Sequence, residues 1–341
     1  ARREMITRRE VAKLAGVSPA TVSNVFDKPS VVKPDTREKV MQAAKQLKYA
    51  PNHAAKILSS GNSRHIGIAV FEYTNPYHME IIRGIENYAI GRDYMVTVFL
   101  LDNAIHDKFS FIQSKQLSAL VNFTTNTYPE SFIDILMNSN TVLVDFGADK
   151  GLSTMIDMRS AYCNFMEKLR EFGHRIVGFV TGMDCDRFYS DVRGQLFLDR
   201  EKYGLCKDEN LIAYNDDYTL SSEERGYLGA KKLLAVRKDI TALFAINDMA
   251  AIGAIRAVSE CGYSVPEDIS VIGCDDISLA RYVNPSLTTI SCNKYDFGRQ
   301  IAEKILECVE GHKDGTGEII SIPAECVYRE SLIPVGKKRK K

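Results

Sequence analysis

The sequence predicts a small all-α unit at the N-terminus, followed by a larger α/β core with two lobes, each built on a parallel sheet. Three observations predict this fold. Residues 7–26 have the pattern of two short helices joined by a tight turn. From Arg64 onward, short β-branched or aliphatic runs alternate with helical stretches, and this series occurs twice. Positive charge is concentrated in residues 1–64, which carry 13 Lys or Arg and 5 Asp or Glu.

The first helix is expected to begin at Arg8. Thr7 and Glu10 have the spacing of a capping box, in which each residue's side chain satisfies a backbone N–H of the other. Gly16 can take the left-handed conformation that ends a helix. Apolar residues at helical spacing form the predicted inner face: Val11, Leu14 and Ala15.

The second helix is expected to be capped by Ser18, with Pro19 at its first position, where a missing N–H does no harm. Its predicted inner face consists of Val22, Val25 and Phe26. Residues 27–30 are predicted to form a loop, and a third helix should start at Pro34. That helix has a predicted inner face of Val40, Ala43, Ala44 and Leu47.

Two helices joined by a short turn that contains glycine are typical of a helix-turn-helix, whose second helix can lie in the major groove of DNA. The outward residues of the second helix are Pro19, Ala20, Thr21, Ser23 and Asn24. Hydroxyl groups of Thr21 and Ser23 suit phosphate oxygens, whereas Asn24 suits a base edge, adenine above all. The alternative is an ordinary helical hairpin whose outer face meets water.

Charge distribution favours the first interpretation. The formal net charge is zero, which alone would argue against a nucleic-acid-binding protein. However, residues 1–64 carry a net charge of +8, residues 65–336 carry −13, and the last five residues are all basic. The N-terminal unit is therefore the part expected to contact a polyanion, since the acidic remainder would repel DNA.

Other features limit the remaining classes of function. The 8 cysteines are scattered without a C-x-x-C pair or the spacing of a metal site, which favours free thiols in a reducing cytosol. No apolar stretch is long enough to span a membrane, so a cytoplasmic protein is expected. No phosphate-binding loop, nucleophile elbow or other catalytic motif is visible, which predicts a protein without enzymatic activity, cofactor or metal.

In the core, two series of strands are expected, each strand followed by a helix. They cover residues 66–71, 95–101, 120–123 and 142–146, and then 176–181, 211–213, 242–246 and 269–273. Ligands of doubly wound sheets bind beyond the carboxyl ends of the strands, so the cleft between the lobes is the expected pocket. Asn247-Asp248 and Asp275-Asp276 follow two of these strands, and Tyr73, Tyr77 and Tyr218 could cover a ligand's apolar face. Alternatively, Asn247 and Asp248 cap the next helix, and Asp276 binds backbone N–H groups.

Several motifs together identify a family resemblance. Residues 10–23, Glu-Val-Ala-Lys-Leu-Ala-Gly-Val-Ser-Pro-Ala-Thr-Val-Ser, closely resemble the headpiece of the lactose-repressor/galactose-repressor family of bacterial transcription regulators. Further similar segments are residues 49–52, 75–77, 173–175, 247–248 and 265–276. The resemblance covers nearly the whole chain and implies a core like that of periplasmic sugar-binding proteins.

The resemblance also implies a division of the chain. Residues 1–50 would be the helix-turn-helix headpiece and 51–62 a hinge helix or linker. One lobe would comprise residues 63–160 plus 293–322, the other 161–292 plus 323–335, and residues 336–341 would be a basic tail. In the family, the hinge helix folds on DNA together with its mate from a second subunit. Its wedge position, which enters the minor groove, is occupied here by Leu58.

The DNA contacts expected on these grounds are Thr7, Ser18, Pro19, Ala20, Thr21, Ser23, Asn24, Asn52, Ala55, Lys56 and Leu58. For residues 51–62, the alternative is a flexible linker with an incidental leucine. The residues that match effector-contacting positions of the family are Tyr77, Asp145, Tyr218, Asn247 and Asp275. Tyr73, Arg187 and Asp191 complete the candidate set. Many members have an arginine where this chain has Asp191, with Arg193 nearby, and Cys292 stands where a hydrogen-bonding residue is frequent.

The sequence therefore predicts a cytoplasmic repressor that binds double-stranded operator DNA of pseudo-palindromic sequence as a homodimer or higher oligomer, without a membrane partner. A small-molecule effector, a sugar or sugar derivative, would control it from the cleft. The alternative is a soluble sugar- or nucleoside-binding module whose headpiece mediates protein contacts.

Overall fold

The computed structural model describes residues 6–27, 29–49, 63–101, 105–124 and 128–337. The chain divides into two compact units, Ala1–Ser63 and Arg64–Lys341. The expected hinge helix, with Asn52, Ala55, Lys56 and Leu58, lies outside the described residues, and so does most of the basic tail.

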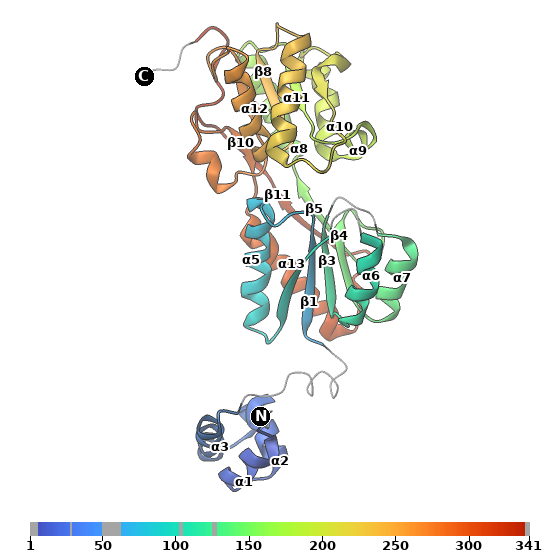
Figure 1. Cartoon of the computed structure of the whole chain (residues 1–341), viewed down its shortest axis with the longest axis vertical. Helices are drawn as coiled ribbons and strands as arrows, with labels where there is room; N and C mark the ends of the chain where they lie inside the picture. Colours follow the sequence, from blue (N-terminus) through green and yellow to red (C-terminus); the bar gives the residue numbers. More distant parts are fainter. Residues whose placement is uncertain (1–5, 28, 50–62, 102–104, 125–127, 338–341) are drawn as a thin grey trace. The chain divides into compact units, whose positions relative to one another are not determined.

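The described residues of the first unit form three α-helices and one short 3-10 helix (Figure 1). They are α1 (Arg8–Ala15), α2 (Pro19–Asp27), η1 (Pro29–Val31) and α3 (Pro34–Leu47). The capping box is present, with the Glu10 carboxylate 2.7 Å from the Thr7 backbone nitrogen. Gly16 ends α1 with a φ of 68°, and the Ser18 hydroxyl accepts the N–H of Thr21 at 3.0 Å. The predicted helix boundaries are thus confirmed.

Two details of this unit differ from the prediction. Leu14 is 46% exposed, because Val11 and Ala12 form the buried face of α1 and Leu14 does not lie on that face. The expected loop at residues 27–30 is mostly helical, since α2 continues to Asp27 and η1 starts at Pro29. The core of the unit consists of Val11, Ala12, Val22, Val25, Val40, Ala43 and Ala44.

The first lobe of the second unit is built on a six-stranded parallel sheet in the order β11-β5-β4-β3-β1-β2. Its strands are β1 (His65–Val70), β2 (Met95–Leu100), β3 (Ala119–Phe123), β4 (Val142–Phe146), β5 (Leu152–Asp157) and β11 (Ile319–Pro323). The helices around it are α5 (Pro76–Ile90), α6 (Ile105–Ser114), α7 (Glu130–Asn138) and α13 (Lys294–Gly311). Ile68 belongs to the core that includes α5, whereas Ala69 belongs to the core that includes α7, so helices cover both faces (Figure 1).

The second lobe is built on a four-stranded parallel sheet in the order β7-β6-β8-β9. Its strands are β6 (Val177–Val180), β7 (Ile212–Ala213), β8 (Ala242–Ala245) and β9 (Ser270–Ile272). Its helices are α8 (Arg159–Glu171), α9 (Cys185–Ser190), α10 (Val192–Leu198), α11 (Ser222–Val236) and α12 (Asp248–Glu260), with short 3-10 turns η2 (Asp199–Tyr203) and η3 (Glu209–Leu211). The expected fold class of two doubly wound lobes is confirmed.

The prediction of a helix after every strand is wrong at two places, since β4 is followed directly by strand β5, and β9 is not followed by an α-helix. Only a 3-10 turn, η4 (Ser278–Arg281), follows β9. The backbone cannot enter an α-helix directly there, because Asp275 and Asp276 have φ values of 119° and 48°. The sequence also missed β5 and an antiparallel ribbon of β10 (Thr289–Ser291) and β12 (Glu325–Val327). No helix in the described part of the chain is long and apolar enough to cross a membrane.

Helices α5 and α13 pack closely because each has a glycine at the crossing. A Cβ atom on Gly84 would lie 2.1 Å from the Tyr295 carbonyl oxygen. Gly84→Ala should therefore lower the free energy of unfolding by about 1–3 kcal/mol, measured by urea denaturation. Gly91→Ala is the control, because Gly91 has a φ of −62° and the nearest atom to an added Cβ is 3.9 Å away. The control should be neutral or slightly stabilising, and equal losses in both variants would contradict this packing argument.

Candidate ligand pocket and helix-turn-helix surface

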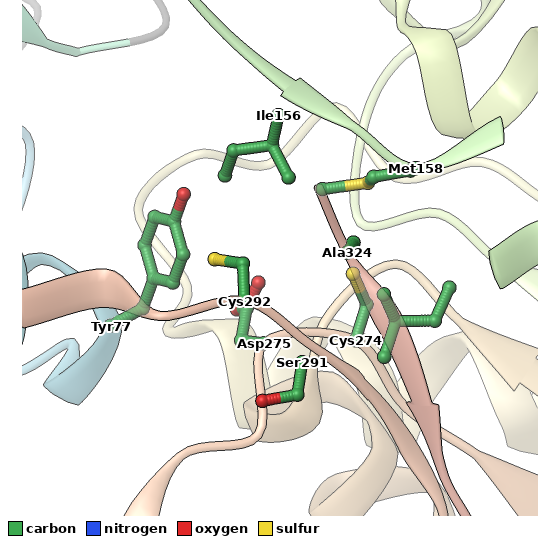
Figure 2. A pocket seen from close by; sticks show the side chains of 9 residues that line it. Tyr77, Ile156, Met158, Cys274, Asp275, Ser291, Cys292 and Ala324 are labelled. Carbon is green, nitrogen blue, oxygen red and sulfur yellow. The ribbon is translucent and has the colours of Figure 1, made fainter. Parts of the chain in front are cut away.

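A pocket with about 180 Å³ of empty space, open solvent included, lies in the second unit beside the carboxyl ends of β5 and β10. It is lined by Tyr77, Ile156, Met158, Cys274, Asp275, Ile290, Ser291, Cys292 and Ala324. Figure 2 shows these side chains around a common space, with Tyr77 and Cys292 on one side and Met158 on the other. Much of this space is open to solvent, and its enclosed part holds no more than about one water molecule. A sugar would therefore require some separation of the lobes.

Asp275 is the only carboxyl group among the lining residues. Its backbone N–H donates to the Ile290 carbonyl at 2.8 Å, and the residue is only 8% exposed. Burial raises the pKa of Asp275 to about 7, although the positive charges of Arg193 and Lys294 oppose the rise. A carboxyl group that is partly ionised at neutral pH can accept hydrogen bonds from a ligand as the anion or donate one as the acid.

Asp191 forms an ion pair with Arg193. Arg193 donates from Nε to Asp191 Oδ1 at 2.9 Å and from Nη2 to Oδ2 at 2.7 Å, while its Nη1 donates to the Ile246 carbonyl at 3.1 Å. Asp191 therefore fixes Arg193, whose charge lowers the pKa of Asp275. Arg193 was missing from the candidate set, although its position two residues after Asp191 was the available signal.

The polar residues beside Asp275 are engaged within the protein. Asn247 caps α12, accepting the N–H of Ala250 at 2.8 Å, as the alternative reading of the sequence proposed. Asp248 is fully buried and accepts the N–H of Ile277 at 2.9 Å. The Asp276 carboxylate binds Arg329 Nη2 at 2.5 Å, and not the backbone N–H groups that the alternative interpretation proposed.

The other candidate residues lie outside the pocket lining. Tyr218 donates its hydroxyl to Asp184 at 2.6 Å, and the Arg187 guanidinium lies 4.5 Å from the Tyr218 ring centre. Tyr73 is 51% exposed. Asp145, at the end of β4, accepts from Asn122 Nδ2 at 2.9 Å, and burial raises its pKa to about 6.

His78 and Asn122 are polar residues that the sequence reasoning missed. The His78 ring stacks on Phe123 with centres 5.6 Å apart, and its buried Nδ1 has no hydrogen-bond partner. Burial lowers the pKa of His78 to about 4, so the ring is neutral. Both residues lie near the carboxyl ends of first-lobe strands, where a doubly wound sheet binds ligands. Within the described residues, no group of three or more His, Cys, Asp or Glu could hold a metal ion.

On the helix-turn-helix, Pro19, Ala20 and Asn24 are exposed on α2. Thr21 and Ser23 are half-buried, which makes them less outward than expected. The Ser23 hydroxyl accepts a hydrogen bond from Arg8 Nη1 at 3.0 Å, so α1 places a guanidinium beside α2 that the sequence reasoning did not select. Thr7 and Ser18 act as helix caps.

Both units of the chain are similar to known protein families. Residues 7–52 match the model of bacterial regulatory proteins of the lacI family, and residues 166–332 match that of the periplasmic binding protein-like domain. The HTH-type transcriptional repressor PurR of Haemophilus influenzae is 33% identical, over 96% of this chain and 99% of that protein. The ribose operon repressor of the same organism is 28% identical over the same shares.

Among solved structures, the Lac repressor dimer bound to operator and the anti-inducer ONPF is similar in fold. Its TM-score is 0.76 at 24% identity, over 97% of this chain and 100% of that chain. At this level of identity the similarity concerns the arrangement of helices and strands.

Proposed function

Because the chain belongs to the lacI family of bacterial regulatory proteins, we propose that it is a DNA-binding repressor controlled by a small polar ligand in the Asp275 pocket. The observation that carries the proposal is the presence, in one chain, of a basic helix-turn-helix unit and a two-lobed core with a pocket between its sheets. A regulator of this kind acts by binding and is not an enzyme. Its place of action would be the cytoplasm, where the DNA is.

The DNA contacts would come from α2 and from the segment 51–62. A headpiece of about fifty residues buries too little surface to be specific alone, so two copies would bind the halves of a pseudo-palindromic operator. Residues 1–50 would then be the DNA-reading part, 51–62 the hinge, and the two lobes of the core the sensor. The positive charge of residues 1–64 supports this assignment.

Asn24→Ala should relax base preference at one position in each half-site. Asn24 is exposed on α2, and an amide can bind the edge of adenine through two hydrogen bonds. The expected loss of discrimination is about 1–3 kcal/mol at that position, with little change elsewhere. Competition binding with operator variants measures it, and Asp35→Asn, at an exposed site on α3, is the control. An equal loss on all DNA sequences would argue against direct reading by Asn24.

The effector would be a sugar or a sugar derivative. Its hydroxyl groups could bind Asp275, and Tyr77 could cover an apolar face. The similarity to a ribose operon repressor supports a sugar. A thermal-shift screen of sugars, sugar phosphates and nucleobases tests this class. A stabilising sugar that also changes operator affinity supports it, whereas stabilisation by nucleobases alone would replace it.

A further inference from the structure

We propose that Lys294 is a positioning residue that fixes the backbone of Asp275 and connects the ligand pocket to helix α5 of the first lobe. Lys294 is the first residue of α13 and is only 5% exposed. Its Nζ donates to the carbonyl oxygens of Asp275 at 2.6 Å and Asp276 at 3.1 Å. The same Nζ lies 3.5 Å from the Glu80 carboxylate on α5. One buried ammonium group therefore joins both lobes.

The two carbonyl groups belong to a backbone that needs support. Asp275 and Asp276 both have positive φ values, 119° and 48°, which residues with a Cβ rarely adopt. Such conformations persist only where surrounding contacts impose them. The Asp275 N–H binds the Ile290 carbonyl, and Lys294 binds the carbonyl of each aspartate. Bonds from an ammonium group are strong, so Lys294 is a main determinant of where the Asp275 side chain lies.

Glu80 extends this connection to the opposite wall of the pocket. Tyr77 and Glu80 are three residues apart on α5, so they share one face of the helix. Tyr77 lines the pocket with Asp275 (Figure 2). Glu80 and Lys294 thus connect the side of the pocket that carries Tyr77 to the side that carries Asp275. A ligand that changes the separation of Tyr77 and Asp275 must also change the contacts of Lys294.

The tight packing of α5 on α13 would carry such a change further. Gly84 and Gly298 bring the helix backbones together, so a displacement of Lys294 at the start of α13 is shared with α5. Both helices belong to the first lobe, whose strand β1 begins at His65, immediately after the headpiece unit in sequence. This coupling to DNA rests on the proposed function, whereas the positioning of Asp275 does not.

The first test is the titration of the Asp275 carboxyl group in the full chain without effector. Groups that act on this carboxyl are Lys294, Arg193, Asp191, Asp248, Cys274, Cys292, Tyr77 and Tyr162. Carbon NMR of protein labelled at aspartate carboxyls follows the titration, and Asp275→Asn identifies the signal. Lys294→Met should move the midpoint to higher pH because a positive charge is lost. Lys294→Arg, which keeps the charge, should stay near the wild-type midpoint of about 7.

The second test measures coupling as the ratio of operator Kd with and without D-ribose, D-glucose or maltose. In the wild type the most effective sugar should change Kd about 5- to 150-fold. Lys294→Met should reduce this factor below about twofold, and Lys294→Arg should restore most of it. If Lys294→Met fails to fold by circular dichroism, Glu80→Gln replaces it, since Lys294 keeps its hydrogen bonds to the carbonyl oxygens of Asp275 and Asp276 when the half-exposed Glu80 becomes neutral.

A Lys294→Met protein with a wild-type Asp275 midpoint and a wild-type coupling factor would overturn the proposal. If Glu80→Gln is used instead, an unchanged coupling factor would also overturn the proposal. If none of the sugars changes the operator affinity of the wild type, the proposed sugar control fails. The Asp275 titration then still decides whether Lys294 positions that residue.

Discussion

Asp275→Asn should give a protein that is more stable near pH 8 and, at the same time, weak in effector binding. In the wild type, burial raises the pKa of Asp275 from 3.8 to about 7. The folded state therefore holds its proton more tightly than the unfolded state, so this group lowers stability as pH rises from about 4 to about 7. Asparagine cannot ionise and removes this loss. The variant should match the wild type below about pH 4 and exceed it by up to a few kcal/mol above pH 7.

Effector binding, by contrast, should be weaker in Asp275→Asn than in the wild type. A carboxylate can accept bonds from two hydroxyl groups of a sugar, whereas an amide offers one acceptor oxygen. The loss of a bond to a charged group is worth about 1.5–3 kcal/mol, which weakens binding tenfold or more. Urea denaturation at pH 5 and pH 8 and calorimetric titration with the best sugar measure the two effects. Asp149→Asn, at an exposed carboxyl, should change neither, and a less stable Asp275→Asn protein at pH 8 would contradict the role of burial.

Arg329→Met should strongly destabilise the second unit. Arg329 and Asp276 form an ion pair whose side chains are only 13% and 10% exposed. Removing the arginine leaves the buried Asp276 carboxylate with only the exposed Arg281 guanidinium, 4.0 Å away. Breaking a buried ion pair in this way typically costs about 3–5 kcal/mol. Urea denaturation of the single variant and of Arg329→Met combined with Asp276→Asn measures this. The double variant should recover part of the loss, because it no longer buries an unpaired charge, whereas a further loss would show that the pair is not coupled.

The local signals of the sequence were sufficient for most of the fold. Capping residues such as Thr7 and Ser18 and the apolar strands predicted element positions within a few residues. Leu14 was placed wrongly because spacing alone does not show which side of a short helix faces the core. The ribbon of β10 and β12 was missed because each strand has only three residues, and its partner is distant in sequence.

The candidate site was less accessible to sequence reasoning. Asp275 and Tyr77 were selected, and the structure places both in one pocket. Arg193, Lys294 and His78 were not selected, because their importance depends on contacts between segments far apart in the chain. Asn247 illustrates the opposite difficulty, since a residue at the end of a strand can cap the next helix as well as face a ligand. Residue type and spacing do not separate these roles.

The central claim is that a basic headpiece binds symmetric DNA and that a ligand in the core controls this binding. Fluorescence anisotropy of a labelled pool of genomic fragments, followed by titration of the selected site at several salt concentrations, tests it directly. We expect a preference for a pseudo-palindromic site, an affinity that falls steeply with salt, and a further change of about 5- to 150-fold with a stabilising sugar. Binding that shows no sequence preference and no response to any ligand of the screen would contradict the account.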